Sequence, residues 1–390
     1  MTDSAHDMHD SSGDRDPLAT GRREFLRRAA GAAALAGIAS NLPSVLRALE
    51  PSARGVAPLD ILVLGGTGFI GPHLVRHAVA RGHRVTIFTR GRRTADLPES
   101  VTRLVGDRNG QLGALQGKRW DIVIDDSATN PDWVRQSVAL LEPSVGAYMF
   151  TSSTGVYYPY LKRGLNESHP VLYDAADPND GSASFGVAKA RCERAVMDAF
   201  GARGIVVRPT YIVGPGDTTD RFPYWPQRIV RGGEILAPGR RDDPVQIIDV
   251  RDLAEFMIGI AERGSRGIYN VAGPKARLTA ARFYETAVNT LGSQAGSPPK
   301  LVYVDDYALL AKHKVEEAIP WAMLRGNDLG MMSIRNDKAV GAGLAFRALD
   351  VTLRDTLTWW GTVPEARKAK PRFTITPEQE AAVLAEWKAR

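Results

Sequence analysis

The sequence has few of the features that mark membrane, disulfide-bonded or nucleic-acid-coating proteins. It holds one cysteine, Cys192, among 390 residues, which excludes an internal disulfide. The apolar run from Ala29 to Leu42 is too short, and too rich in Ala and Gly, for a transmembrane helix. The 50 Lys and Arg residues are nearly balanced by 44 Asp and Glu, and they form no long basic cluster. This composition favours a mid-sized enzyme with a small-molecule substrate, and we expect neither a metal nor a nucleic acid as its partner.

Paired arginines precede that apolar run, in the segment TGRREFLRR at Thr20 to Arg28. Adjacent arginines before a short, weakly apolar stretch are typical of a twin-arginine export signal. We therefore expect residues 1–40 to be a signal peptide, residues 41–57 to be a linker, and the mature protein to be periplasmic. The alternative is that Arg22 and Arg23 begin an amphipathic N-terminal helix.

A glycine-spaced turn follows an apolar strand in LDILVLGGTGFIG, at Leu59 to Gly71. In such a turn the glycines allow a tight bend, the approach of a pyrophosphate to the backbone, and close packing of the helix on the strand. The following helix, about Phe69 to Arg81, would direct its N-terminal amides at the phosphates. The pattern predicts a dinucleotide site with these cofactor-binding residues: Gly65, Thr67, Gly68, Phe69, Ile70 and Gly71.

The second predicted strand, Arg84 to Thr89, lacks a carboxylate at its end. A carboxylate there would bind the ribose 2′-hydroxyl of NAD, but the chain continues with Arg90, Arg92 and Arg93. Guanidinium groups suit the 2′-phosphate of NADP, so the sequence slightly favours NADP over NAD, and a solvated basic loop is the alternative. Asp107, after the third strand, is expected either to face the adenine or to form a simple turn.

Strands and helices go on alternating after this unit. Strands are predicted at Asp121 to Asp125, Ala147 to Ser152 and Ile205 to Pro209, with a helix at about Ser184 to Phe200. The pattern predicts an α/β fold with a Rossmann-type, doubly wound parallel sheet and a smaller C-terminal lobe. We assign residues 59–208 and 245–273 to the NAD(P)-binding domain, and residues 209–244 and 274–390 to a substrate-binding lobe.

Several segments together resemble the extended short-chain dehydrogenase/reductase superfamily, in its NAD-dependent epimerase/dehydratase branch. Beside GGTGFIG they are TSSTGVYY at Thr151 to Tyr158, FGVAK at Phe185 to Lys189, VRPTYIVGPGD at Val207 to Asp217, and QIIDVRDLA at Gln246 to Ala254. The resemblance covers about Leu59 to Gly273. It implies the fold and an NAD(P) cofactor, and it leaves the substrate open because the superfamily handles sugars, phenols and steroids on one scaffold.

In the resembled family a Ser or Thr binds the reacting oxygen, a Tyr transfers its proton, and a Lys four residues later holds the nicotinamide ribose. Ser153 and Lys189 match these positions, but Phe185 occupies the position of the tyrosine. Spacing of four residues keeps both side chains on one helix face. Three accounts stay open: a relocated proton donor, catalysis without a phenol, or a binding protein that has lost catalysis. The tyrosines considered for a relocated donor are Tyr157, Tyr158, Tyr160, Tyr173 and Tyr211, with Tyr157 named beside Ser153 and Lys189 as catalytic.

The resemblance also implies roles for neighbouring residues. Ser152 and Pro209 are expected beside the cofactor. Dehydratases of the superfamily carry an Asp–Glu pair after the catalytic hydroxyl, and Thr154 and Gly155 stand there instead, which disfavours dehydration. The expected substrate-binding residues are Thr154, Tyr211, Asp217 and Arg221, although the last two also fit a hydrogen-bonded turn with a solvated charge pair.

Export would exclude an enzyme that needs fresh cofactor at each turnover, because free nicotinamide cofactors are not expected outside the cytoplasm. A tightly held cofactor that takes a hydride from a substrate and returns it would suffice, so we predict a redox-neutral, epimerase-like enzyme acting on a sugar or polyol. One alternative is a non-catalytic NAD(P)- or RNA-binding protein, since Arg221 to Gly233 mixes aromatics with arginine and resembles chloroplast stem-loop RNA-binding proteins. Another is an NADPH-dependent reductase, if the chain is not exported. Homodimers are common in the resembled family.

Overall fold

The computed structural model describes most of the chain from Ala57 to Arg390, which forms one compact unit. The predicted signal peptide, and the linker up to Val56, lie outside the described residues. The described ranges are 57–126, 128–175, 177, 179–315, 321, 324–372 and 374–390.

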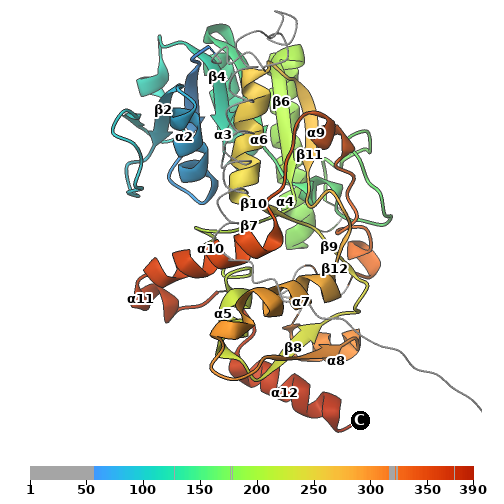
Figure 1. The fold of residues 1–390 in the computed structure, drawn as a ribbon. Helices are drawn as coiled ribbons and strands as arrows, with labels where there is room; N and C mark the ends of the chain where they lie inside the picture. The colour runs from blue at the N-terminus through green and yellow to red at the C-terminus, as the bar shows by residue number, and fades with distance from the viewer. Residues whose placement is uncertain are drawn as a thin grey trace, which may run out of the picture. The chain divides into compact units, whose positions relative to one another are not determined.

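A seven-stranded parallel sheet is the centre of the first domain (Figure 1). Its strand order is β11-β6-β5-β4-β1-β2-β3, and every neighbouring pair is parallel. This order confirms the predicted doubly wound α/β fold. The strands are β1 (Asp60–Leu64), β2 (Arg84–Thr89), β3 (Thr102–Val105), β4 (Trp120–Asp125), β5 (Val145–Thr151), β6 (Gly204–Pro209) and β11 (Gly267–Val271).

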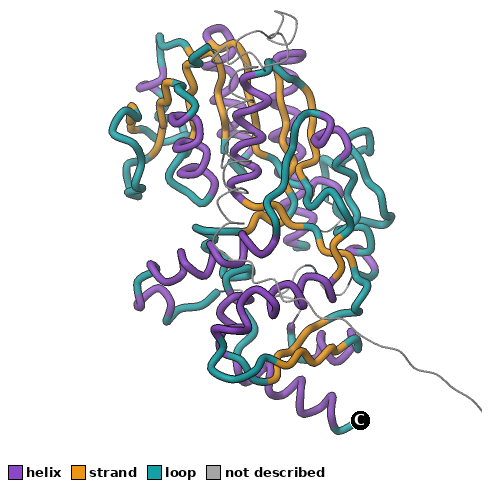
Figure 2. The backbone as a smooth tube through the Cα atoms, viewed as in Figure 1, coloured by secondary structure: helices purple, strands orange, loops and turns teal. Residues whose placement is uncertain are grey.

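Helices cover both faces of this sheet (Figure 2). Ile61 and Val63 of β1 pack in the cluster that α2 (Ile70–Ala80) and α6 (Val250–Glu262) complete, whereas Leu62 and Leu64 pack in the cluster of α3 (Pro131–Leu141) and α4 (Gly181–Phe200). Successive side chains of a strand point to opposite faces, so a strand that is buried on both faces reads as a continuous apolar run. This explains why β1 could be recognised in the sequence.

The lobe is built from three two-stranded sheets and several helices. Its core is aromatic, with Phe222, Trp225, Phe283 and Tyr284 fully buried against one another. The paired strands are β7 (Tyr211–Val213) with β10 (Ile247–Asp249), β8 (Glu234–Pro238) with β13 (Lys300–Val304), and β9 (Pro244–Val245) with β12 (Leu278–Thr279). The helices are α5 (Tyr224–Arg231), α7 (Ala280–Leu291), α8 (Tyr307–Lys312), α10 (Leu349–Thr362), α11 (Glu365–Lys368) and α12 (Pro377–Lys388).

One late segment leaves the lobe and returns to the first domain. The short helix α9 (Asp337–Gly341) contacts β11, and Ala339 and Leu344 are buried in the same apolar cluster as α2 and α6. Because this segment follows Pro274, the sequence predicts that it belongs to the lobe. Its apolar side chains instead extend the first domain's core.

Neither a membrane span nor a metal cluster is found in the part of the chain that the structure describes. No helix there has the length and apolar character needed to cross a bilayer. The described residues also hold no group of three or more His, Cys, Asp and Glu side chains that could bind a metal ion. Cys192 is fully buried on α4, and burial raises the pKa of its thiol to about 12.

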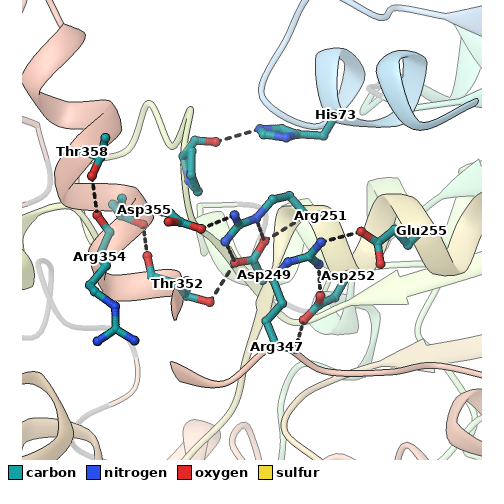
Figure 3. Close-up of polar contacts among 12 residues, drawn as sticks. His73, Asp249, Arg251, Asp252, Glu255, Arg347, Thr352, Arg354, Asp355 and Thr358 are labelled. Atoms are coloured by element: carbon teal, nitrogen blue, oxygen red, sulfur yellow. Dashed lines mark hydrogen bonds and ion pairs between the residues drawn. The ribbon is translucent and has the colours of Figure 1, made fainter. Parts of the chain in front are cut away.

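A buried carboxylate ties α10 of the lobe to the start of α6 (Figure 3). Asp249 caps α6, with Oδ1 accepting from the backbone N of Arg251 at 2.8 Å and from its Nε at 2.9 Å. Its Oδ2 accepts from Arg251 Nη2 and from Thr352 Oγ1, both at 2.7 Å. Arg251 also pairs with Asp355 of α10. Charge-assisted hydrogen bonds therefore hold the start of α6 and α10 of the lobe together.

The variant Asp249→Asn should be less stable than the wild type at neutral pH by about 2 kcal/mol, since charge-assisted hydrogen bonds are lost in a buried position. Burial raises the pKa of Asp249, but the hydrogen bonds from Arg251 and Thr352 outweigh it and lower the pKa overall. A carboxylate with a lowered folded-state pKa contributes stability above its unfolded pKa and loses it as the pH falls through the folded value. The difference between variant and wild type should therefore shrink below about pH 4.

Urea unfolding at neutral and acidic pH measures this difference. The matched control is Asp355→Asn, whose side chain is 43% exposed and whose effect should stay within about 1 kcal/mol. Equal effects of the two substitutions would contradict a special role for the Asp249 carboxylate.

Candidate active site

The turn after β1 has the geometry of a phosphate cradle. Gly65 and Gly66 have φ angles of 119° and 97°, which side-chain-bearing residues rarely adopt. A Cβ on Gly71 would lie 2.4 Å from backbone atoms of Gly66, so helix and turn meet only because Gly71 has none. A Cβ on Gly68 would meet nothing within 4 Å. Close packing at Gly71 and open space at Gly68 are what a pyrophosphate above this turn requires.

The N-terminus of α2 is also suited to an anion. The helix begins at Ile70, its N-cap is Phe69, and no side chain caps its first amides. Uncapped amides at a helix start favour a negatively charged ligand. Gly66 N donates to Asp126 Oδ2 at 3.3 Å, which joins the turn to the end of β4. Thr67 also lies in this turn. The turn and the start of α2 together fit the pyrophosphate of a dinucleotide.

The two residues predicted at the adenosine end do not line the cavity described below. Arg90 is exposed after β2. Asp107 Oδ1 accepts from Asn109 N at 3.0 Å, and its backbone pairs with Gln111, so this side chain forms the simple turn that the sequence left open. The choice between NAD and NADP remains a prediction.

A cavity of about 820 Å³ lies between the ends of β5 and β6 and the lobe. It brings together most of the predicted residues beyond the glycine turn: Phe69, Ile70, Ser152, Ser153, Thr154, Lys189, Pro209, Tyr211, Asp217 and Arg221. The lining does not include Tyr157. It does include residues from the late part of the chain that no motif indicated, namely Trp321, Arg325, Asp328 and Met331.

Ser153 and Phe185 both lie next to Gly155. Ser153 caps a short 3₁₀ helix (Thr154–Tyr157), and its Oγ accepts from Gly155 N at 3.0 Å. A Cβ placed on Gly155 would be 3.0 Å from Cε1 of Phe185 and 3.2 Å from Ser153 Oγ. The ring therefore approaches the hydroxyl that the family uses to bind the reacting oxygen, and a tyrosine at position 185 would carry its phenol into this region.

Lys189 lies one helical turn after Phe185 and is buried. Its Nζ donates to the carbonyl oxygens of Ala128, at 2.8 Å, and Thr151, at 2.9 Å. An ammonium has three donors, so one N–H is left for a ligand in the cavity. Burial lowers the pKa of Lys189, and the charges of Asp125 and Asp126 oppose that shift.

Two hydroxyls beside Lys189 lack partners among the described residues. Thr151 Oγ1 and Ser152 Oγ are buried and accept or donate no hydrogen bond there, although both residues line the cavity. Buried polar atoms are nearly always satisfied, so such a pair points to a polar ligand. Together with the glycine cradle, these hydroxyls fit the polar end of a nicotinamide dinucleotide.

Tyr157 is held away from the cavity by a buried network. Its hydroxyl donates to Asn270 Oδ1 at 2.9 Å and accepts from Arg208 Nη1 at 2.7 Å. Arg208 in turn forms a buried ion pair with Glu193, at 2.6 Å. Burial raises the pKa of Tyr157. These contacts favour a structural role, and the sequence could not distinguish Tyr157 from the tyrosine that follows it.

Three other tyrosines line the cavity. The Tyr158 hydroxyl donates to Asp180 Oδ2 at 2.8 Å, and the side chains of Tyr160 and Thr154 are hydrogen-bonded. The Tyr211 hydroxyl points toward Met331 Sδ at 3.7 Å, and burial raises the pKa of Tyr211 to about 12. Tyr173, also considered, is outside the lining and stacks beneath Arg194.

Asp217 stabilises the turn that follows β7. Its Oδ1 accepts from both the backbone N and Oγ1 of Thr219, each at 2.7 Å. Burial raises the pKa of this carboxyl group. Asp217 and Arg221 both line the cavity. Asp217 therefore forms the turn, and substrate binding by either residue stays a prediction.

The comparisons agree with this geometry. Residues 61–272 match the model of the NAD dependent epimerase/dehydratase family. The chain belongs to this family. The Chloroplast stem-loop binding protein of 41 kDa b of Arabidopsis thaliana is 30% identical over 234 residues, which are 55% of this chain and 59% of that protein. The 2-alkyl-3-oxoalkanoate reductase of Stenotrophomonas maltophilia is 28% identical, over 51% of this chain and 64% of that protein.

A solved member of the same fold is the UDP-N-acetylglucosamine 4-epimerase of Methanobrevibacter ruminantium, in complex with UDP-N-acetylmuramic acid. It superimposes with a TM-score of 0.59 at 20% identity, covering 78% of this chain and 99% of that one. Identity this low supports the fold alone. Phe185 stands where the resemblance would place a tyrosine, and the loss of that tyrosine remains a prediction.

The segment that suggested RNA binding is accounted for by packing. Phe222 and Trp225 are fully buried in the lobe core, and Tyr224 is nearly so. Arg228 is buried too, with Nε donating to Glu380 Oε1 at 2.8 Å and to Oε2 at 2.7 Å. Rings and a guanidinium committed to the core cannot stack on bases. Arg221 to Gly233 therefore no longer supports an RNA partner.

Proposed function

We propose that this protein is an exported, epimerase-like enzyme that removes a hydride from a carbinol carbon of a sugar or polyol and returns it to the same molecule. Bound NAD or NADP would supply the hydride acceptor and donor. The observation that carries the proposal is the grouping of Ser153, Lys189 and the two unpartnered hydroxyls, Thr151 and Ser152, around one cavity.

The chain's own residues would perform the proton and binding steps. Ser153 Oγ is placed to bind the reacting oxygen beside the Phe185 ring. The remaining N–H of Lys189 and the hydroxyls of Thr151 and Ser152 would hold the ribose and the carboxamide end of the cofactor. The glycine turn and the start of α2 would bind the pyrophosphate.

Because Phe185 has no hydroxyl, another group must accept the proton of the reacting carbinol. The donors and acceptors that line the cavity include the hydroxyls of Tyr158, Tyr160 and Tyr211. Tyr158 is the tyrosine among them that is hydrogen-bonded to a carboxylate, Asp180, which offers a route for the proton to solvent. We assign the relocated proton transfer to Tyr158 in preference to Tyr157, which has no access to the cavity.

Export by the twin-arginine route supports a permanently bound cofactor, because this route carries folded proteins. The test is to recover mature protein from the exported fraction, denature it, and identify the released nucleotide by mass spectrometry. Near-stoichiometric NAD(H) or NADP(H) is the expected result. An exported protein without nucleotide, and unable to bind one, would refute the proposal.

An NADPH-consuming reductase is the second candidate. It is supported by the match to the 2-alkyl-3-oxoalkanoate reductase and by the arginines after β2, which suit a 2′-phosphate. A deuterium label on the substrate carbinol separates the two candidates. The epimerase-like enzyme retains the label in its product, whereas a reductase run in reverse transfers it to released cofactor.

The variant Phe185→Tyr tests whether the phenol has been relocated. If Tyr158 already transfers the proton, a second phenol beside Ser153 should leave the rate unchanged or lower it by up to about tenfold, as a small geometric disturbance does. If catalysis was lost with the tyrosine, the substitution should instead raise oxidoreductase activity by about a hundredfold or more. Single-turnover reduction of the bound cofactor by substrate measures both outcomes.

A further inference from the structure

The substrate side of the cavity is lined by aromatic rings. Tyr158 and Tyr160 form an edge-to-face pair with ring centroids 5.9 Å apart, and Tyr211 and Trp321 form another at 6.3 Å. Phe185 lies in the same lining, and its side chain is 42% exposed. An exposed ring in a concave site is ready to contact a ligand, because covering it removes apolar surface from water.

The charged residues of the lining cancel one another. Three are cationic and three are acidic, and the pocket therefore has no formal excess of either sign: Lys189, Arg221, Arg325, Asp126, Asp217 and Asp328. A nucleoside diphosphate carries two negative charges and is usually met by an excess of guanidinium or ammonium groups. This lining offers no such excess.

Two exposed leucines directly follow residues of the cavity lining in the sequence. Tyr160 N donates to Asn327 O at 2.7 Å, and Gly330 N donates to Tyr160 O at 2.8 Å. Leu161 follows Tyr160 and Leu329 follows Asp328, which both line the cavity, and the two leucines are 63% and 37% exposed. Exposed apolar residues next to a pocket are available to apolar groups of a ligand.

We propose that the substrate's polyol part is joined to an uncharged aromatic or alicyclic group, and that this group binds against Phe185 and the two aromatic pairs. The inference rests on the proposed function, since that function places the reacting carbinol at Ser153. Such a substrate differs from a nucleotide sugar, because the cavity would bind an apolar ring system in place of a nucleoside diphosphate.

Three glucosides that share one sugar test the inference by isothermal titration into the full-length protein loaded with its nucleotide. They are methyl β-D-glucoside, 2-naphthyl β-D-glucoside and UDP-glucose. The naphthyl glucoside should bind about tenfold or more tightly than either of the others, because the rings that line the cavity cover its apolar surface. Tighter binding of UDP-glucose, or equal binding of all three, would overturn the inference.

Two exposed positions provide a matched pair of variants. Phe185→Ala should weaken binding of the naphthyl glucoside about fivefold or more, and binding of the methyl glucoside by less, since only the larger ligand covers the ring with an apolar group. Leu172→Ser, at a side chain that is 52% exposed and outside the lining, should change neither. Equal effects of Phe185→Ala on both ligands would contradict the assigned contact.

The outcomes separate this inference from the function on which it rests. Binding of the naphthyl glucoside without deuterium retention at its carbinol carbon would leave the substrate class standing and refute hydride return. Deuterium retention with UDP-glucose, and none with the naphthyl glucoside, would leave hydride return standing and refute the substrate class.

Discussion

Gly71→Ala should lower the affinity for nucleotide by about five- to a hundredfold, because overpacking against backbone costs about 1–3 kcal/mol and moves the groups it displaces. The added Cβ would lie 2.4 Å from Gly66 Cα and 2.8 Å from Asp126 Oδ2. Neither the turn nor the start of α2 can yield without changing the cradle. The variant protein should also be less stable, so thermal unfolding is measured beside the nucleotide content of purified protein.

Gly68→Ala is the informative companion of this variant. Its Cβ meets nothing within 4 Å in the protein, so stability should be unchanged. If a pyrophosphate lies above the turn, the same Cβ should weaken nucleotide binding. Gly361→Ala, likewise free of close neighbours, is the control that should affect neither quantity. Normal nucleotide binding by Gly68→Ala would show that the cofactor does not approach this glycine.

Lys189→Met should reduce turnover by about a hundredfold, because loss of the ammonium that would hold the nicotinamide ribose lets the cofactor shift from its reacting position. It also leaves the carbonyl oxygens of Ala128 and Thr151 without their donor, and each unsatisfied group costs about 1–3 kcal/mol. Single-turnover kinetics measure the first effect, and urea unfolding measures the second. Lys118→Met, at an exposed lysine, is the control.

The pH dependence gives this lysine a signature that misfolding would not produce. Burial lowers the pKa of Lys189, so wild-type turnover should decline as the pH rises through that lowered value and the ammonium loses its proton. In the methionine variant the residual turnover should lack this alkaline decline. An unchanged profile would mean that another group controls the step.

The sequence predicted the sheet more accurately than the site. Continuous apolar strands such as β1 and β2 are fixed by burial on both faces, and β2 has the predicted bounds, Arg84–Thr89. The helix α4 begins at Gly181, three residues before its predicted start, because the Asp180 side chain caps Ser182 and Ala183. Capping is a local signal that the apolar pattern does not contain.

Residues that are far apart in the sequence form the site, so local sequence patterns could not predict all of it. Adjacent tyrosines at 157 and 158 look alike in the sequence, and the difference between them comes from Asn270 and Arg208, which surround the first hydroxyl. Trp321 and Met331 reach the cavity through the folding of the lobe and belong to no motif. The family resemblance indicated Ser153 and Lys189, whose positions are set by one strand end and one helix.

The ion pair between Arg228 and Glu380 has a consequence for the order of events in synthesis. Arg228 is buried in the lobe, and its carboxylate partner lies on α12, more than a hundred residues later along the chain. Until that helix has emerged from the ribosome, the guanidinium would be buried without a counter-charge, at a cost of several kcal/mol. The lobe therefore reaches its final packing only once α12 has been synthesised.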